Sequence, residues 1–310
     1  MKNKNIIVTG GAGFIGSTLV DTVLEDNKVT VIDNFSTGKL SNIKNPDHEN
    51  LTIIKEDINN LELTSILEDK DYIFHFAAIA SVAYSIKEPE ITFKNNVGST
   101  EKLINASLDT NIKKIIFSSS SAIYGDNENL PLKESEIPDP ESPYAESKVD
   151  CENLLSEAYE NYGLNYTNLR YFNIYGPKQN KDSQYASVIP NFVNRILNNE
   201  KPTIFGDGEQ TRDFIYVKDI VNANLTASKN DFNGVCNIAS GKSITVNELF
   251  ETIAKILDFK EEPNYLPERP GEIKYSEADI SQMHKNNFNL EYTNMEDNLK
   301  ETIDYFKKIL

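Results

Sequence analysis

Short apolar runs alternate with longer amphipathic stretches through the first half of the chain. The runs are four or five residues long and rich in Ile, Val and Phe, as strands buried on both faces of a sheet are. They lie at residues 6–9, 29–32, 51–54, 72–76 and 114–117. Apolar residues at helical spacing fill stretches between and after them, chiefly 17–25, 90–108 and 143–162. Strands and helices in this order are typical of an α/β protein.

A glycine-rich turn joins the first strand to the first helix. Its sequence, Gly-Gly-Ala-Gly-Phe-Ile-Gly, occupies residues 10–16. In this context glycines let backbone N–H groups approach a pyrophosphate at the positive end of the helix. Asp33 ends the second strand, where a carboxylate binds the adenosine ribose, and Asn34 beside it, in place of Arg, favours NAD over NADP. The alternative is a glycine turn with a purely structural role.

The ends of the next two strands carry further candidate cofactor contacts. Asp57 and Ile58 follow the third strand, in a position to receive an adenine amino group. Ala77 and Ala78 follow the fourth strand, and their small side chains let a cofactor lie close. His75, inside the fourth strand, is more typical of a hydrogen-bonded core histidine than of a catalyst.

Polar side chains also occur where the later elements meet the predicted sheet edge. Asn96 lies inside the helical stretch 90–108, where its amide either supports the cofactor site or is exposed on the surface without a functional role. Four serines, residues 118–121, follow the fifth strand at its carboxyl end, the edge where open α/β sheets keep ligand sites. A polar surface loop is the alternative for these serines. A proline-rich loop, 128–141, comes next.

The segment after this loop has the clearest helix boundaries in the chain. Ser142 followed by Pro143 is a typical helix start, and Gly163 is a typical helix end. Tyr144 and Lys148 then stand four residues apart on one helix face, about 6 Å apart at Cβ. This spacing also occurs by chance on many solvated helix faces.

Tyr144 and Lys148 form a candidate general base. A free tyrosine has a pKa of about 10, and a nearby ammonium favours the phenolate and lowers that pKa. A shift of about 3 units requires roughly 4 kcal/mol, which a partly desolvated Lys148 together with a positively charged nicotinamide ring can supply. The pair is therefore predicted to take a proton from an alcohol.

Length and charge narrow the function classes. A chain of 310 residues, 39% of them hydrophobic, has enough apolar residues for a large and a smaller domain. The net charge of -17 argues against nucleic acid or an anionic membrane surface as a partner. No apolar run is long enough to span a membrane and no signal-like segment opens the chain, so a soluble, cytoplasmic protein is expected.

Cysteines and histidines are few and scattered. Cys151 and Cys236 are far apart in sequence and form neither a disulfide framework nor a metal motif, and the histidines are only three. No metal site is expected.

Together these motifs resemble the extended short-chain dehydrogenase/reductase family and, within it, the UDP-hexose 4-epimerases. The resemblance covers essentially the whole chain. The residues that carry it are Thr9 to Gly16, Asp33, Asn34, His75 to Ala78, Asn95 to Val97, Phe117 to Ser120, Tyr124, Gly125, Tyr144, Lys148 and Arg170 to Asn173.

The resemblance implies a doubly wound parallel Rossmann sheet, a tightly held NAD and a homodimer packed through the helices near 90–108 and 144–162. It also implies which residues contact the cofactor. These are Gly10, Gly13, Phe14, Ile15, Gly16, Asp33, Asn34, Asp57, Ile58, Phe76, Ala77, Ala78, Asn96, Ser118, Tyr144, Lys148 and Tyr171.

The same resemblance makes Ser120 the catalytic hydroxyl beside Tyr144 and Lys148, with Ser119 and Ser121 as possible substitutes. Members of the family that are 4,6-dehydratases carry Asp-Glu directly after this hydroxyl, and decarboxylases keep a glutamate there. This chain has Ser121 and Ala122 at those positions. The absence of an acid favours epimerisation, which needs only hydride movement and one proton relay.

The second half resembles the part of the family that binds a sugar nucleotide. Arg212 and Arg269 match the two arginines that clamp the pyrophosphate, for which the guanidinium group is well suited. Phe205 matches the residue that stacks on uracil, and Glu272 stands where an aspartate is more often found for the ribose. The implied substrate contacts are Ser120, Tyr144, Asn173, Ser187, Val188, Phe205, Arg212, Arg269, Glu272 and Ser276.

Ser276 matches the family's gate beside the 2-substituent of the sugar. A tyrosine there excludes an N-acetyl group, whereas a small residue leaves room for it. Serine predicts that UDP-N-acetylglucosamine and its galacto epimer are accepted along with UDP-glucose and UDP-galactose.

The predicted NAD-binding domain covers residues 1–171, with 213–240 returning to it, and 172–212 with 241–310 form the predicted UDP-sugar domain. The predicted function is interconversion of UDP-glucose and UDP-galactose at C4 through a 4-keto sugar. One alternative is an epimerase or reductase for another nucleotide sugar, such as a uronic acid or a deoxyhexose. The other is a non-enzymatic NAD-binding sensor, which is expected to have lost the catalytic Tyr, Lys or Ser.

Overall fold

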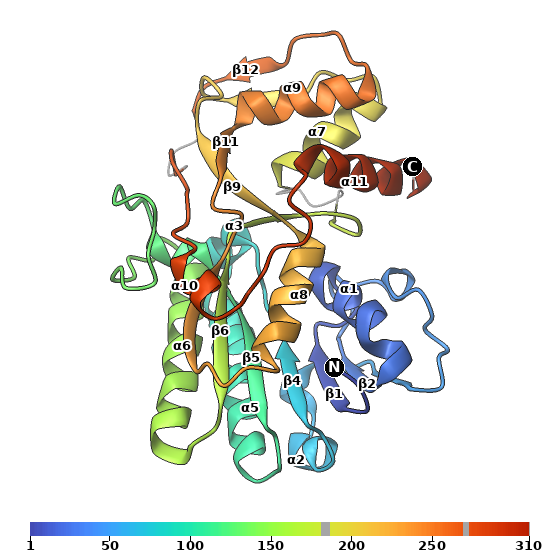
Figure 1. The fold of residues 1–310 in the computed structure, drawn as a ribbon, viewed down its shortest axis with the longest axis vertical. Coiled ribbons are helices and arrows are strands. Elements are labelled where there is room, and N and C mark those ends of the chain that lie inside the picture. Colours follow the sequence, from blue (N-terminus) through green and yellow to red (C-terminus); the bar gives the residue numbers. More distant parts are fainter. Residues whose placement is uncertain (181–186, 269–272, 310) are drawn as a thin grey trace.

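A seven-stranded parallel sheet forms the lower half of the molecule in Figure 1. The computed structural model describes residues 1–180, 187–268 and 273–309. The strand order is β10-β6-β5-β4-β1-β2-β3, so the winding direction reverses between β1 and β4 and the sheet is doubly wound, as predicted. The bounds are β1 Asn5–Thr9, β2 Lys28–Ile32, β3 Leu51–Ile54, β4 Tyr72–His75, β5 Lys114–Ser120, β6 Tyr166–Tyr171 and β10 Gly234–Ile238.

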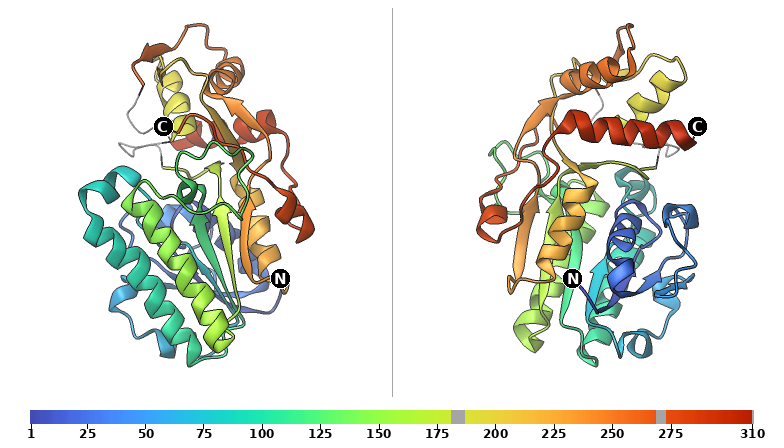
Figure 2. Two further views of the ribbon diagram at one scale, coloured as in Figure 1. Left: turned by 90° about the vertical axis from the view of Figure 1, so that its left-hand side faces the viewer. Right: turned by 45° about the vertical axis from the view of Figure 1, so that its right-hand side comes forward.

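Helices cover both faces of this sheet (Figure 2). The α1 and α8 helices pack together on one face, and α2, α5 and α6 cover the other. The first strand shows the reason, because Ile6 and Val8 pack into the α1–α8 core while Ile7 points into the α5–α6 core. The bounds are α1 Phe14–Val23, α2 Leu63–Leu67, α3 Val82–Lys87, α4 Pro89–Phe93, α5 Ser99–Leu108, α6 Pro143–Tyr162 and α8 Val217–Ala227.

The upper half of Figure 1 has two small sheets and a separate core. The sheets have the orders β11-β9-β7 and β12-β8. Phe192 and Phe250 meet edge to face in the core, with ring centroids 6.0 Å apart, and Phe306 packs in the same cluster. The bounds are β7 Asn173–Tyr175, β8 Thr203–Phe205, β9 Thr211–Tyr216, β11 Ser243–Thr245, β12 Asn264–Leu266, α7 Val188–Leu197, α9 Val246–Leu257 and α11 Met295–Ile309.

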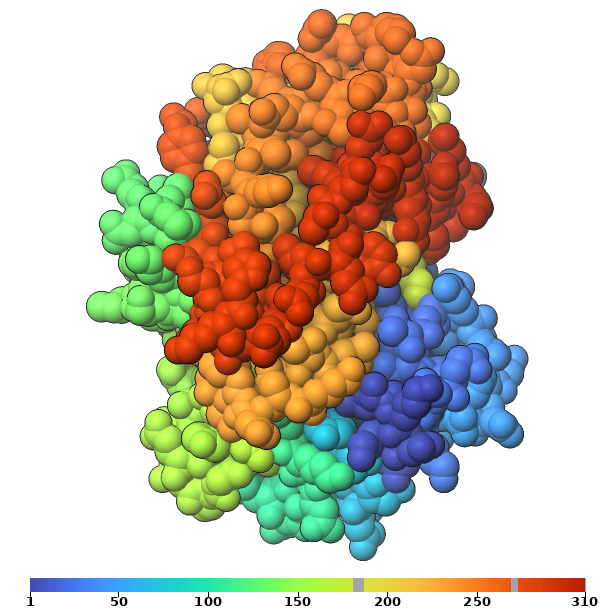
Figure 3. Space-filling model, viewed as in Figure 1, coloured from blue at the N-terminus to red at the C-terminus, as the bar shows by residue number. Residues whose placement is uncertain are grey.

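A late part of the chain runs back to the large sheet. The short helix α10 Ser281–Lys285 packs on β10, and Met283 and Phe288 are buried in the core that α1 and α8 share with the sheet. Figure 3 shows this red-orange part of the chain crossing the face between the two halves. The boundaries of the NAD-binding and UDP-sugar domains remain a prediction.

Most predicted elements are confirmed, with three local differences. Gly13 is the N-cap of α1, so the last three residues of the glycine motif form its first turn and the helix begins earlier than predicted. The fifth strand continues to Ser120, so the first three serines belong to the sheet edge. The predicted helix 90–108 is broken by a π-helical turn, Lys94–Gly98, between α4 and α5.

Candidate active site

Helix α6 presents the predicted catalytic pair at the carboxyl edge of the sheet. The Ser142 hydroxyl accepts a hydrogen bond from the Ala145 N–H at 3.2 Å, and Pro143 occupies the first helical position. Gly163 ends the helix with φ 74°, in the left-handed region that favours glycine. The predicted helix boundaries are therefore confirmed, and they place Tyr144 in the first turn.

Tyr144, Lys148 and Ser120 lie together. The Ser120 side chain lies close enough to the phenol of Tyr144 to favour its ionised form. The Lys148 side chain is buried, and its Nζ donates to the Ser118 carbonyl at 2.7 Å. The same nitrogen lies 4.6 Å from the ring centroid of Phe117 and 5.9 Å from that of Tyr144, so the ammonium rests on aromatic faces.

The pKa of Tyr144 is raised, whereas the sequence predicted that Lys148 would lower it. Burial raises this pKa above its ordinary value, and the nearby Ser120 side chain opposes the rise. In the protein without cofactor, Lys148 does not lower the pKa of Tyr144 as expected. Its ammonium contacts the Tyr144 ring face and the Ser118 carbonyl rather than the phenol oxygen. Burial lowers the pKa of Lys148 to about 8.

The serine next to Tyr144 is Ser120, and Ser119 is directed elsewhere. Side chains alternate along a strand, and Ser119 faces helix α6, where its hydroxyl donates to Glu152. Ser120 also caps the following turn by accepting from the Ala122 N–H at 3.2 Å. Ser119 is therefore not available as a substitute for Ser120.

A cleft at the carboxyl ends of β1, β2 and β4 gathers most of the predicted cofactor residues. Its volume is about 130 Å³. It is lined by Gly10, Gly13, Ile32, Asp33, Asn34, Ser36, Thr37, Glu56, Asp57, Ile58, Phe76, Ala77, Ala78, Ile79 and Asn95. The prediction did not include four of these residues, Ser36, Thr37, Glu56 and Ile79. They lie just after the carboxyl ends of predicted strands, so their positions in the sequence could have identified them.

The glycines of residues 10–16 allow close backbone approaches in this cleft. A Cβ on Gly10, whose φ is +66°, would lie 2.8 Å from the Ala77 nitrogen. A Cβ on Gly16 would lie 2.3 Å from the Gly10 carbonyl oxygen. Gly13 leaves the start of α1 without a side-chain cap, and its first turn has no acidic residue, so the positive end of the helix is open to an anion.

Two carboxylates that the sequence predicted to contact the cofactor, Asp33 and Asp57, line the cleft. Asp33 accepts hydrogen bonds from the Ala12 N–H at 2.8 Å and the Phe35 N–H at 2.7 Å, which fix it at the end of β2. Asn34 donates to Asp57 at 3.1 Å. Asn34 and Asp57 are thus held in contact with each other, and Asp33 is held by the backbone.

His75 and Asn96 are buried supports rather than cleft-lining residues. The ring nitrogens of His75 bond to the Thr9 and Thr100 hydroxyls at 2.6 and 3.0 Å, and burial lowers the pKa of His75 to about 3. The core interpretation of this histidine is confirmed. Asn96 accepts from the Ile79 N–H at 2.8 Å and donates to Ser147 at 2.9 Å, so it braces the cleft against α6.

A larger cavity, of about 610 Å³, contains several predicted substrate residues. It lies in the upper half, between β7, β8, β9 and the start of α7. Asn173, Ser187, Val188, Phe205 and Arg212 all line it. The sequence did not indicate Asn191, Arg195, Gln210 and Leu266, which line it too.

The strand order places the Tyr144 group between the two cavities. The residues that follow β4 line the cofactor cleft, and Ser120 is the last residue of β5. Asn173, which lines the larger cavity, comes two residues after the end of β6. Because β4, β5 and β6 are neighbours in the sheet, the three strand ends lie side by side at one edge. The end of β5, which carries Ser120, therefore lies between the strand ends that lead to the two cavities.

Some predicted residues lie elsewhere. The Tyr171 side chain is in the core, where its hydroxyl bonds to Asn224 on α8, so it does not reach the cleft. Phe14 packs against the core of the upper half. Ser276 is buried just before Ala278, whose N–H donates to Asp213 at 3.4 Å. Arg269 and Glu272 lie outside the described residues.

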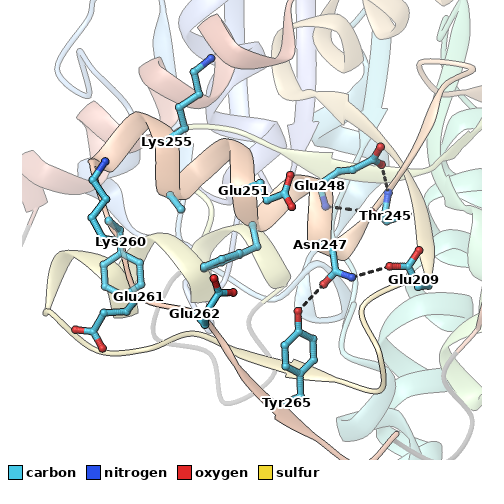
Figure 4. A pocket seen from close by; sticks show the side chains of 13 residues that line it. Glu209, Thr245, Asn247, Glu248, Glu251, Lys255, Lys260, Glu261, Glu262 and Tyr265 are labelled. Carbon is cyan, nitrogen blue, oxygen red and sulfur yellow. Dashed lines mark hydrogen bonds between the residues drawn. The ribbon is translucent and has the colours of Figure 1, made fainter.

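A further cavity on the outer side of α9 contains none of the predicted site residues (Figure 4). Glutamates surround it, and in the close-up Asn247 bonds to Glu209 and to Tyr265. Within the described residues no cluster of His, Cys, Asp and Glu is suited to a metal ion. The same residues contain no helix with the length and apolarity needed to span a bilayer.

Comparison with known proteins decides the family. The model of the NAD dependent epimerase/dehydratase family matches residues 6–239. The chain belongs to this family. The epimerase/dehydratase family includes the UDP-hexose 4-epimerases that the motifs resemble, so the sequence-based assignment is confirmed.

Three solved epimerases are similar to the chain over nearly its full length. The UDP-N-acetylglucosamine 4-epimerase from Methanobrevibacter ruminantium M1, in complex with UDP-N-acetylmuramic acid, is 54% identical with a TM-score of 0.99, and the match covers 100% of both chains. The UDP-glucose 4-epimerase from Thermotoga maritima, with UDP-glucose, is 41% identical with a TM-score of 0.93, covering 98% and 99%. The UDP-glucuronic acid 4-epimerase from Bacillus cereus, with UDP-glucuronic acid and NAD, is 32% identical with a TM-score of 0.92, covering 99% and 100%.

NAD is the cofactor of this epimerase/dehydratase family member, and the cleft fits it. Gly10 and Gly16 let the turn pack closely against the Ala77 and Gly10 backbone, and the uncapped start of α1 that this turn leads into suits a pyrophosphate. The carboxylate of Asp33 at the end of β2 suits its ribose hydroxyls.

Gly16→Ala tests this cleft. The new Cβ meets the Gly10 carbonyl at 2.3 Å, so the turn must open and NAD affinity is expected to fall at least a hundredfold, as measured by calorimetry on NAD-stripped protein. Gly98→Ala is the control, since its Cβ meets nothing within 4 Å and its helical φ of -60° suits alanine. Undiminished NAD binding by Gly16→Ala would contradict the assignment.

Proposed function

We propose that the protein inverts C4 of UDP-hexoses, interconverting UDP-glucose with UDP-galactose and UDP-N-acetylglucosamine with UDP-N-acetylgalactosamine. The observation that carries the proposal is the Tyr144–Ser120–Lys148 group at a sheet edge between the cofactor cleft and the larger cavity. The similarity to epimerases of several UDP-sugars supports the reaction class.

Tyr144 is proposed to move the proton. Its oxygen takes the proton of the sugar 4-hydroxyl, with Ser120 as the hydrogen-bonding relay. NAD, when bound, accepts the hydride from C4 and returns it, so no net redox change occurs. Lys148 is proposed to hold the nicotinamide ribose and keep positive charge near the phenol.

The raised pKa of Tyr144 gives the bound cofactor a role in this scheme. Burial by itself favours the neutral phenol. A cationic nicotinamide ring held near Tyr144 would add positive charge in a region of low dielectric and would therefore favour the phenolate. Tyr144 is thus expected to become an effective base only in the NAD-loaded protein.

The larger cavity is proposed to hold the UDP part of the substrate. Phe205 offers an aromatic face for uracil, and Arg212 offers a guanidinium for the pyrophosphate. Arg269 is proposed as the second arginine of this clamp. Binding through the nucleotide leaves the 4-keto hexose free to rotate, so that its opposite face can receive the hydride at C4. A group that must rotate cannot be tightly held.

Exposed apolar side chains support a homodimer. Ile86 is 62% exposed, and Ile91, Leu108 and Tyr159 are also exposed on the adjoining helices α4, α5 and α6. Exposed apolar residues on one helical face are typical of a subunit interface. Pairing of two copies through this face, as the sequence resemblance implied, is proposed.

Tyr144→Phe tests the reaction. The variant keeps the ring but loses the proton acceptor, so kcat for UDP-galactose is expected to fall by about 10² to 10⁴ while bound NAD is retained. The assay measures epimerised product by chromatography without added NAD. Tyr162→Phe, at the exposed end of the same helix, is the control with wild-type turnover. An active Tyr144→Phe enzyme would refute the role.

Ser276→Tyr tests the sugar gate. The larger ring is expected to lower kcat/KM for UDP-N-acetylgalactosamine at least tenfold more than for UDP-galactose, because the family resemblance implies that residue 276 lies beside the 2-substituent of the sugar. Ser276→Ala should leave both substrates unaffected and controls for the lost hydroxyl. Wild-type protein that turns over only the plain pair would sink the prediction of N-acetyl acceptance.

Ile86→Asp tests the homodimer. A carboxylate in an apolar interface is expected to shift the protein from twice the chain mass to the chain mass in light scattering. Ile137→Asp is matched, since Ile137 is 85% exposed but lies in the loop before α6, and this variant should stay dimeric. A dimeric Ile86→Asp protein would place the interface elsewhere.

A further inference from the structure

Helix α6 and strand β5 are joined by three side-chain links, and the reaction as described uses only two of them. Tyr144 meets Ser120, and Lys148 meets a strand carbonyl. The third link comes from Glu152, one turn beyond Lys148, which accepts a hydrogen bond from the Ser119 hydroxyl at 2.5 Å. The three helix residues follow one another at a spacing of four.

The carboxylate of Glu152 is held in place by Arg170. Arg170 on β6 donates to it from Nη2 at 2.7 Å and from Nε at 3.0 Å, and both side chains are more than nine-tenths buried. The remaining Arg170 nitrogen donates to the Tyr124 hydroxyl at 2.9 Å, which donates in turn to Asn237 at 2.6 Å. The network therefore ties α6 to β5, β6 and β10.

This network acts on the strand residue that precedes the catalytic hydroxyl. Ser119 lies directly opposite Arg170 in the β5–β6 register. The ladder with β6 extends to Ser120, and the Ser119 link adds a side-chain restraint on the last residues of β5. Because the Ser118 carbonyl and the Ser120 backbone flank Ser119, this restraint also acts on them.

The energetics point the same way. A buried ion pair gives little net stability compared with apolar packing of the same volume, because desolvation offsets the attraction. The geometry that this pair can define is between α6, which presents Tyr144 and Lys148, and β6. The hydrogen bond from Ser119 extends this link to β5, which presents Ser120.

We propose that Glu152, fixed by Arg170, is a positioning residue for the reaction. Through Ser119 it sets the end of β5 so that the Ser120 hydroxyl meets Tyr144. Glu152 itself touches neither the cofactor nor the sugar. The inference rests on the epimerase activity proposed above.

Ser119→Ala is the sharpest test, because it cuts the link and leaves the Glu152–Arg170 pair intact. We expect kcat for UDP-galactose to fall about tenfold with KM within about twofold, since misplacement of catalytic groups affects turnover more than nucleotide binding. The control is Ser107→Ala on α5, which removes an equally buried hydroxyl that donates to the Leu103 carbonyl at 2.7 Å. Its kcat should stay within about twofold of wild type, with both variants retaining NAD.

Glu152→Gln provides the second arm. We expect a larger loss of kcat, and the double variant Ser119→Ala/Glu152→Gln should be no slower than Glu152→Gln alone, because both changes break the same link. Independent, multiplying losses would overturn the proposal. If Glu152→Gln fails to fold, the Ser119→Ala comparison decides by itself.

Crystal structures of wild type and Ser119→Ala separate this proposal from the function on which it rests. A wild-type protein inactive on every UDP-hexose would reject the proposed function, and the positions of the Ser120 Oγ and Lys148 Nζ would then decide the positioning role alone. A displaced Ser120 hydroxyl in Ser119→Ala supports that role. Unmoved groups, or equal kcat in Ser119→Ala and Ser107→Ala, would overturn it.

Discussion

Burial of the Lys148 ammonium is the constraint around which the site is arranged. An ammonium removed from water loses several kcal/mol of solvation, which acceptors and aromatic faces must offset. The Ser118 carbonyl and the Phe117 ring provide these contacts, and they require the end of β5 to lie against the second turn of α6. The same contact brings Ser120 to Tyr144. Charge, hydroxyl and phenol are therefore positioned by a single packing arrangement.

The winding of the sheet explains why two ligands can meet at this point. Parallel strands direct their carboxyl ends to one edge, and reversal of the winding between β1 and β4 opens a cleft there. The residues after β6 then lead away from the large sheet into the upper half, where the second cavity is built over a core of its own. On the proposed function, NAD in the first cavity and a nucleotide in the second would both face the end of β5.

The two cavities make different demands on the protein. The cofactor cleft is formed by backbone and fixed side chains, as the Asp33 contacts with two N–H groups illustrate. The cavity proposed for the substrate is larger and combines an aromatic side chain, Phe205, with a guanidinium, Arg212. Rigid cofactor binding with a substrate held by one end suits a reaction in which the reacting ring must present both faces.

Local signals in the sequence determined the helix that starts after Ser142 and ends at Gly163, and the glycine turn, because caps and glycine conformations depend on a few adjacent residues. The family motifs also pointed to the residues that gather in the two cavities. Which serine faces Tyr144, and in which direction burial moves the pKa of that tyrosine, depended on partners distant in sequence, such as Glu152. Strand register, solvent exclusion and long-range ion pairs come from tertiary packing, and no short stretch of sequence contains them.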